Sequence, residues 1–154
     1  MIVHHIDVKN AYLNAHLNEI VYMEQPTYFQ QEDPKLFVCK LERSIYGLKQ
    51  SAKCWNNHLK KIMLIVGLKP FTCKPCIFAT DSRSVIIGAY VDDLLVAVRR
   101  PEAIGELVRR ISSQINITHK GQVKSFLGIT WTSTKTNSHS INLPISINYS
   151  TIRI

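Results

Sequence analysis

The amino-acid sequence predicts an α+β domain, in which an antiparallel sheet carries helices on one of its faces. Strand-like and helix-like segments follow one another in the order strand, helix, hairpin, helix, strand, with short connections. The regular strand–helix–strand units that a doubly wound parallel sheet requires are absent from this order. With 154 residues, 45% of them apolar, the chain is long enough for one domain with its own core.

The first half of the chain contains two expected strands and two expected helices. Residues 2–8 are rich in β-branched side chains and predict a short strand, which residues 11–17 follow as a short helix. Two prolines in the polar stretch 24–34 indicate a loop, and the alternating residues 36–41 predict a second strand. Apolar side chains at helical spacing then predict an amphipathic helix over residues 51–66.

Turn residues follow this helix. Gly67 is expected just past the helix end, where glycine is favoured because the backbone adopts a left-handed conformation. Pro70 and Pro75 bracket an expected loop, and residues 76–80 predict a short strand.

A β-hairpin is the main feature of the second half. Two apolar runs, SVIIGAYV and LLVAV, are separated by Asp92 and Asp93, so the hairpin carries two acids at its tip. A second amphipathic helix is expected to extend to about residue 115. Residues 126–132 predict a last strand, and the tail from Thr134 has only a weak apolar rhythm.

Basic residues exceed acidic residues in this chain. Nineteen Lys and Arg against eleven Asp and Glu give a formal net charge of +8 and a pI of about 9.5. This excess favours a polyanionic partner, either nucleic acid or a membrane surface. Many basic domains bind nothing specific, however, so charge alone leaves the partner open.

Three features predict an intracellular protein, cytoplasmic or nuclear, that is neither secreted nor inserted in a membrane. No apolar run reaches the roughly 18 residues of a transmembrane helix. The N-terminal segment has no basic start, and Asp7 and Lys9 interrupt any apolar stretch that a signal peptide would need. The four cysteines form no secreted disulfide pattern, and Cys73-x-x-Cys76 lacks the second pair of a zinc site.

The adjacent acids Asp92 and Asp93 are the most informative feature. Because turns accept Asp readily, the pair can be a solvated turn. Two carboxylates held close together also attract a divalent cation, and Mg²⁺ prefers such hard oxygen ligands. If the strand over residues 2–8 pairs beside the hairpin, Asp7 joins the pair at one sheet edge. Three such acids can hold two metal ions for phosphoryl transfer, and without metal at least one carboxylate pKa is expected to rise.

Five sequence blocks carry a resemblance to a known family. In chain order they read DVKNAYLNAHL, VYMEQP, VCKLERSIYGLKQSAKCW, AYVDDLLVA and FLGI. This series resembles the reverse transcriptase of copia-type LTR retrotransposons, a part of the Pol polyprotein, over almost the whole chain. The resemblance implies a polymerase palm with partial fingers and thumb. The palm-like domain would cover residues 1–133, and residues 134–154 would begin the following segment.

The resemblance also implies roles for nine residues. Asp7, Asp92 and Asp93 match the metal-binding catalytic triad, and the backbone carbonyl of Val8 matches a further metal ligand. Tyr12 matches the aromatic residue under the incoming sugar, although by burial statistics alone it would be assigned to the core. The segment that backs the nucleotide and the template has four matching residues: Tyr46, Gly47, Lys49 and Gln50.

Some positions match less closely. Residues 126–129 resemble the strand that carries the primer grip, and Trp55 fits the family pattern but is expected in the core. Ala15, His16 and Ala52 depart from the pattern, and none of them is an expected metal ligand.

The resemblance therefore implies an RNA-directed DNA polymerase, a nucleotidyltransferase that uses Mg²⁺ or Mn²⁺ to add dNTPs to a primer on an RNA or DNA template. Parts of the fingers and thumb are expected to lie outside the chain, so we expect little polymerisation without other Pol segments. One alternative is an inactive nucleic-acid-binding remnant of such a polymerase. Another is an unrelated two-metal nucleotidyltransferase or cyclase, which would leave the YGLKQ and VYMEQP blocks unexplained. The sequence predicts no oligomeric state.

Overall fold

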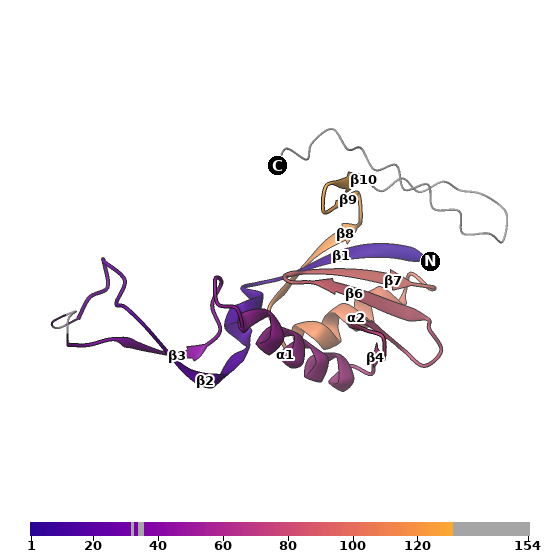
Figure 1. Cartoon of the computed structure of the whole chain (residues 1–154). Coiled ribbons are helices and arrows are strands. Elements are labelled where there is room, and N and C mark those ends of the chain that lie inside the picture. The colour runs from indigo at the N-terminus through magenta and orange to yellow at the C-terminus, as the bar shows by residue number, and fades with distance from the viewer. Residues whose placement is uncertain (32, 34–35, 131–154) are drawn as a thin grey trace.

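A computed structural model describes residues 1–31, 33 and 36–130 of the chain. Its main element is a six-stranded sheet in the order β4-β5-β6-β7-β1-β8, in which all neighbouring strands are antiparallel (Figure 1). Two helices, α1 (Ser51–Ile65) and α2 (Ala103–Ser112), cover one face of this sheet. The predicted α+β class is therefore confirmed. Neither of these two helices is long and apolar enough to cross a membrane.

The remaining elements are short strands and one helical turn. The strands of the main sheet are β1 (Ile2–Val8), β4 (Lys69–Phe71), β5 (Lys74–Ala79), β6 (Val85–Tyr90), β7 (Asp93–Val98) and β8 (Ile117–Gln122). Two separate hairpins pair β2 (His16–Met23) with β3 (Cys39–Arg43) and β9 (Ser125–Phe126) with β10 (Ile129–Thr130). A 3₁₀-helix, η1 (Ala11–Asn14), follows β1.

The core lies between the sheet and the two helices. Along β7 the side chains of Leu94, Val96 and Val98 are fully buried, whereas those of Leu95 and Ala97 are only partly buried. This alternation shows that the sheet buries one face, because successive side chains of a strand point to opposite sides. The apolar sides of the helices complete the core with Trp55, Leu59, Ile62 and Met63 from α1 and Leu107 and Ile111 from α2.

The helix expected over residues 11–17 is wrong beyond its first turn. Only η1 is helical there, and the Asn14 side chain closes it by donating hydrogen bonds to the carbonyls of Lys9 and Asn10, both at 3.0 Å. The chain then enters β2, whose non-local pairing with β3 overrides the local pattern.

Some strands begin and end at other residues than the sequence predicts, because pairing with a neighbouring strand sets their bounds. The strand expected over residues 36–41 lies at β3 instead, because Met23 pairs with Cys39. The loop expected between the prolines is the hairpin β4–β5. Pro70 is tolerated because β4 is an edge strand, where a missing N–H interrupts no ladder.

The C-terminal elements differ most from expectation. α2 ends at Ser112, before the expected residue 115, and the polar strand β8 had no sequence prediction. The strand expected over residues 126–132 is the hairpin β9–β10, turned by Leu127 and Gly128 at φ of 49° and 78°. Residue 131 onward lies outside the described residues, and so does the predicted domain boundary.

Two glycines allow a matched test of backbone conformation. Gly67 follows α1 at φ +86°, as predicted for a C′ residue, so Gly67→Ala is expected to lower the free energy of unfolding by about 1 kcal/mol. Gly105 lies inside α2, and no atom lies within 4 Å of an added Cβ, so Gly105→Ala is expected to raise it by about 0.5–1 kcal/mol. Urea denaturation measures both changes, and shifts of the same sign would contradict this account.

Candidate active site

The end of β1 and the turn between β6 and β7 bring the acidic residues together. β1 pairs with β7 so that Asp7 lies directly opposite Asp93. The N–H of Val8 donates a hydrogen bond to the Asp92 carbonyl at 2.6 Å. Strand pairing beside the hairpin, expected from the sequence, is confirmed. Opposed Cβ atoms in an antiparallel pair are about 5 Å apart, so Asp7 and Asp93 are neighbours on the sheet.

The hairpin turn is supported from α1. Tyr90 pairs with Asp93, which leaves Val91 and Asp92 as the two turn residues. Val91 has a φ of +51°, which is rare for a β-branched residue. The Trp55 indole donates a hydrogen bond to the Val91 carbonyl at 2.8 Å, and Trp55 is only 3% exposed. Trp55 is thus buried as predicted, and it also anchors the strained turn.

Basic side chains surround two of the three carboxylates. Asp7 lies between Lys9, whose Nζ is 2.8 Å from Oδ2, and Lys120, whose Nζ is 2.7 Å from Oδ1. Asp93 Oδ1 is 2.5 Å from His5 Nε2 and 3.8 Å from Lys120 Nζ. Lys120 therefore lies between the two opposed acids and neutralises part of their charge.

These contacts reverse the expected electrostatics at Asp7. Hydrogen bonds from Lys120 and Lys9 hold the pKa of Asp7 below its usual range, and the bond to Asp7 raises the pKa of Lys120. The sequence predicts that at least one carboxylate pKa of the cluster rises, and Asp7 is not that carboxylate. The hydrogen bonds and charges of two nearby ammonium groups outweigh the effect of burial, which alone would raise this pKa. No local signal marked Lys120, because it lies on β8, which pairs with β1 only in the folded chain.

Two tyrosines connect Asp92 to η1. The Tyr46 hydroxyl donates a hydrogen bond to Asp92 Oδ1 at 2.6 Å, and the Tyr46 ring centroid is 4.6 Å from that of Tyr12. Burial, together with the bond to Asp92, raises the pKa of Tyr46 to about 12. Tyr12 lies in η1, where it is partly buried against the core. The structure thus joins Tyr12, Tyr46 and Asp92 in one chain of contacts.

The other three residues singled out by the sequence precede α1. Gly47 has a φ of +97°, a conformation that favours glycine, and Gln50 is the N-cap residue of α1. Lys49 is exposed. In the part of the chain that the structure describes, no hydrogen bond or ion pair joins these side chains to the three carboxylates.

The donor set of this site suits a hard divalent cation, because it offers three carboxylates and a nearby backbone carbonyl. In the structure, however, the three carboxylates are oriented towards side chains of the protein itself. Among residues 1–31, 33 and 36–130, no three His, Cys, Asp or Glu side chains are arranged to hold a metal ion. The carboxylate oxygens of the three acids contact other groups instead: those of Asp7 face Lys120, those of Asp93 face His5 and those of Asp92 face Tyr46. Metal binding here therefore requires the carboxylates to exchange these partners for the cation.

The role of Lys120 can be tested by substitution. Lys120→Gln is expected to move the pKa of Asp7 up towards 3.8, because one of its two ammonium partners is lost. A lowered pKa stabilises the fold above the unfolded value near 3.8, and this contribution disappears as the pH falls through the folded value. At pH 7 we therefore expect a loss of up to about 1 kcal/mol of stability, which fades in acid.

Carboxyl NMR titration of Asp7 checks the expected pKa change, and urea denaturation at pH 7 and in acid checks the expected change in stability. Lys69→Gln serves as the matched control, because it breaks the exposed pair of Lys69 with Asp81. An Asp7 titration that is the same in wild type and Lys120→Gln would show that Lys120 does not control this carboxylate.

The amino-acid sequence matches a known protein family. Residues 1–149 match the family described as reverse transcriptase (RNA-dependent DNA polymerase). The chain is 30% identical over 129 residues to the retrovirus-related Pol polyprotein from transposon RE1 of Arabidopsis thaliana, a match that covers 82% of this chain and 9% of that protein. Over 130 residues it is 32% identical to the Pol polyprotein from transposon TNT 1-94 of Nicotiana tabacum, covering 82% and 10%.

A yeast relative is more distant. The transposon Ty1-MR1 Gag-Pol polyprotein of Saccharomyces cerevisiae is 26% identical over 110 residues, which cover 71% of this chain and 6% of that protein. The chain thus spans about a tenth or less of the length of these relatives. Because the family match covers almost the whole chain, the chain belongs to the reverse transcriptase (RNA-dependent DNA polymerase) family of copia- and Ty1-type retrotransposon Pol polyproteins.

Proposed function

We propose that this chain is the palm of an RNA-directed DNA polymerase and that Asp7, Asp92 and Asp93 bind its Mg²⁺ or Mn²⁺. The observation that carries the proposal is the pairing of Asp7 with Asp93 on adjacent strands, with Asp92 in the turn beside them. The three acids thus come from two segments, β1 and the β6–β7 hairpin, that are far apart in the sequence and adjacent in the sheet. Membership in the reverse transcriptase family supports the same assignment.

Each remaining site residue has a proposed task towards the primer, the template and the dNTP. Bound cations would supply activation of the primer 3′-hydroxyl and neutralisation of the phosphates. The Val8 carbonyl would add a ligand beside the three acids. Tyr12 would lie under the sugar, with Tyr46 packed against its ring. The segment before α1 would back the nucleotide and the template with Gly47, Lys49 and Gln50.

A nucleic-acid-binding remnant without catalysis is the second candidate. It is favoured by the contacts of Lys9 and Lys120 with Asp7 and of His5 with Asp93, because these side chains already occupy carboxylate oxygens that a metal ion would need. The net charge of +8 supports template–primer binding under both candidates. An unrelated nucleotidyltransferase or cyclase is excluded by the family match.

Titration with Mn²⁺ tests the proposed metal site. The 154-residue chain should bind Mn²⁺ and gain thermal stability, because a ligand that binds only the folded state stabilises it. Asp92→Asn/Asp93→Asn should weaken binding by about tenfold or more, since two anionic ligands are lost. Asp81→Asn is the matched control, because Asp81 is an exposed acid that pairs with Lys69.

The outcomes separate the two candidates. Equal Mn²⁺ binding by wild type and the double variant would overturn the metal site and leave the remnant as the better account. Loss of binding in the double variant, with unchanged binding in Asp81→Asn, would support the palm assignment.

A further inference from the structure

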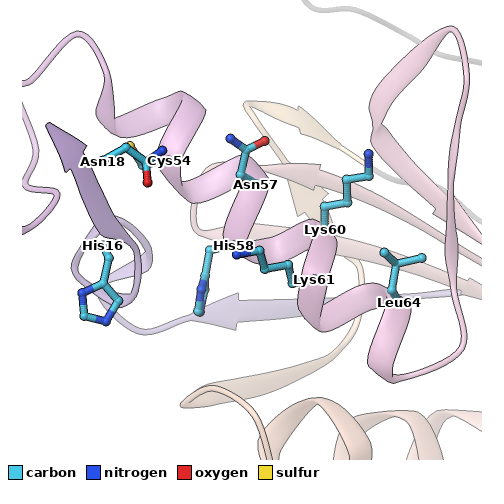
Figure 2. A pocket seen from close by; sticks show the side chains of 8 residues that line it. All are labelled: His16, Asn18, Cys54, Asn57, His58, Lys60, Lys61 and Leu64. Carbon is cyan, nitrogen blue, oxygen red and sulfur yellow. The ribbon is translucent and has the colours of Figure 1, made fainter.

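A basic pocket lies beside α1, apart from the acidic site. A pocket of about 410 Å³ opens between α1 and the beginning of β2 (Figure 2). β2 contributes His16 and Asn18 to its lining. The polar lining residues from α1 are Asn57, His58, Lys60 and Lys61. None of these residues belongs to the acidic site.

The pocket has a one-sided charge. Its lining contains two lysines and two histidines and no Asp or Glu, and α1 has no acidic residue in its 15 positions. Arg43 lies outside the lining, but it pairs with His16 across β2 and β3, and its charge acts on His58. Among the described residues, no carboxylate forms an ion pair with Lys60, Lys61 or Arg43. Within the described part of the chain, the positive charge of this pocket is therefore not neutralised by an ion pair.

The pKa of His58 responds to the positive charges around the pocket. Burial lowers the pKa of His58, and the charges of Lys61, His16 and Arg43 lower it further. Three basic groups from two strands and one helix thus act on a single imidazole. A bound anion would oppose all three and raise the pKa of His58.

We propose that this pocket binds a phosphate group. Ammonium groups make strong charge-assisted hydrogen bonds to phosphate oxygens, and the imidazole N–H groups and the amides of Asn18 and Asn57 supply further donors. A pocket with this lining repels cations, so it differs in chemistry from the acidic site. The phosphate can come from a nucleic-acid backbone or from a free phosphorylated molecule. The proposal holds whether or not the acids bind a metal.

Binding of inorganic pyrophosphate to the ¹⁵N-labelled 154-residue chain tests the proposal, at constant ionic strength and without metal. We expect saturable shifts of the Asn57 and Asn18 amide signals and a rise in the pKa of His58. Lys60→Gln/Lys61→Gln should weaken binding by about tenfold or more, because two charge-assisted bonds are lost. Both lysines are exposed, so this double variant should keep the fold.

Two controls give the test its specificity. Arg99→Gln/Arg100→Gln also removes two positive charges, from two consecutive exposed residues that do not line the pocket. It should leave pyrophosphate binding unchanged. Asp92→Asn/Asp93→Asn should also leave it unchanged, which separates this proposal from the proposed polymerase function. Equal weakening by the lysine and arginine variants would overturn the proposal. So would shifts that never saturate and that spread over the whole basic surface.

A short single-stranded oligonucleotide distinguishes the two phosphate sources. If the oligonucleotide displaces pyrophosphate from the wild type, the pocket takes a backbone phosphate. If pyrophosphate stays bound at every oligonucleotide concentration, the pocket takes a free phosphorylated molecule. Either result supports a phosphate site, provided that Lys60→Gln/Lys61→Gln loses it.

Discussion

Asp92→Asn is expected to abolish primer extension in a chimera that carries this chain within the flanking segments of the TNT 1-94 Pol polyprotein. The flanking segments are included because the chain matches only 10% of that relative. A carboxylate that holds a catalytic cation contributes several kcal/mol to the transition state, so the rate should fall by about a thousandfold or more. Extension of a DNA primer on an RNA template with Mg²⁺ and dNTPs measures the effect.

The same chimera supplies its own controls. Asp81→Asn removes an exposed acid that pairs with Lys69 and should extend the primer at the unmodified rate. Asp92→Asn should keep the unfolding midpoint of the unmodified chimera, because Asp92 lies in a turn. Rapid extension by Asp92→Asn would refute its catalytic role. A failure of the unmodified chimera to extend would favour the non-catalytic candidate.

Tyr12→Ala should relax the choice between deoxyribonucleotides and ribonucleotides. If Tyr12 lies under the incoming sugar, its ring excludes a 2′-hydroxyl, and removing the ring opens that space. Steric exclusion in a close-fitting site changes discrimination by about 1–3 kcal/mol, so ribonucleotide incorporation should rise at least about tenfold relative to deoxyribonucleotide. Single-nucleotide incorporation by the chimera with dNTPs and rNTPs gives the ratio.

Tyr12→Phe is the matched control for this prediction. It keeps the ring and its contact with Tyr46, whose centroid lies 4.6 Å away, and removes only the hydroxyl. Discrimination should therefore remain as in the unmodified chimera. If Tyr12→Ala also keeps full discrimination, Tyr12 serves only as a residue of η1 that packs against the core.

The acidic residues of the candidate site could be predicted from the sequence, and their basic partners could not. The resemblance pointed to Asp7 and the pair Asp92 and Asp93, because these acids lie in the matching sequence blocks. The basic partners of these acids were not predicted. Lys120 lies 113 positions from Asp7, and its strand has a polar sequence, so neither periodicity nor spacing marked it. His5 was assigned to a strand with no partner, since its contact with Asp93 depends on strand register.

By itself the sequence determined the fold class, the two amphipathic helices and the acidic hairpin, because these depend on local patterns of apolar residues and turns. The spacing of Trp55, Leu59 and Met63 predicts α1. Tertiary structure alone decided β2, β4 and β8, whose polar or proline-containing residues form strands because a partner strand satisfies their backbone. It also decided the charge state around Asp7, because an ion pair depends on distance in space and not on distance along the chain.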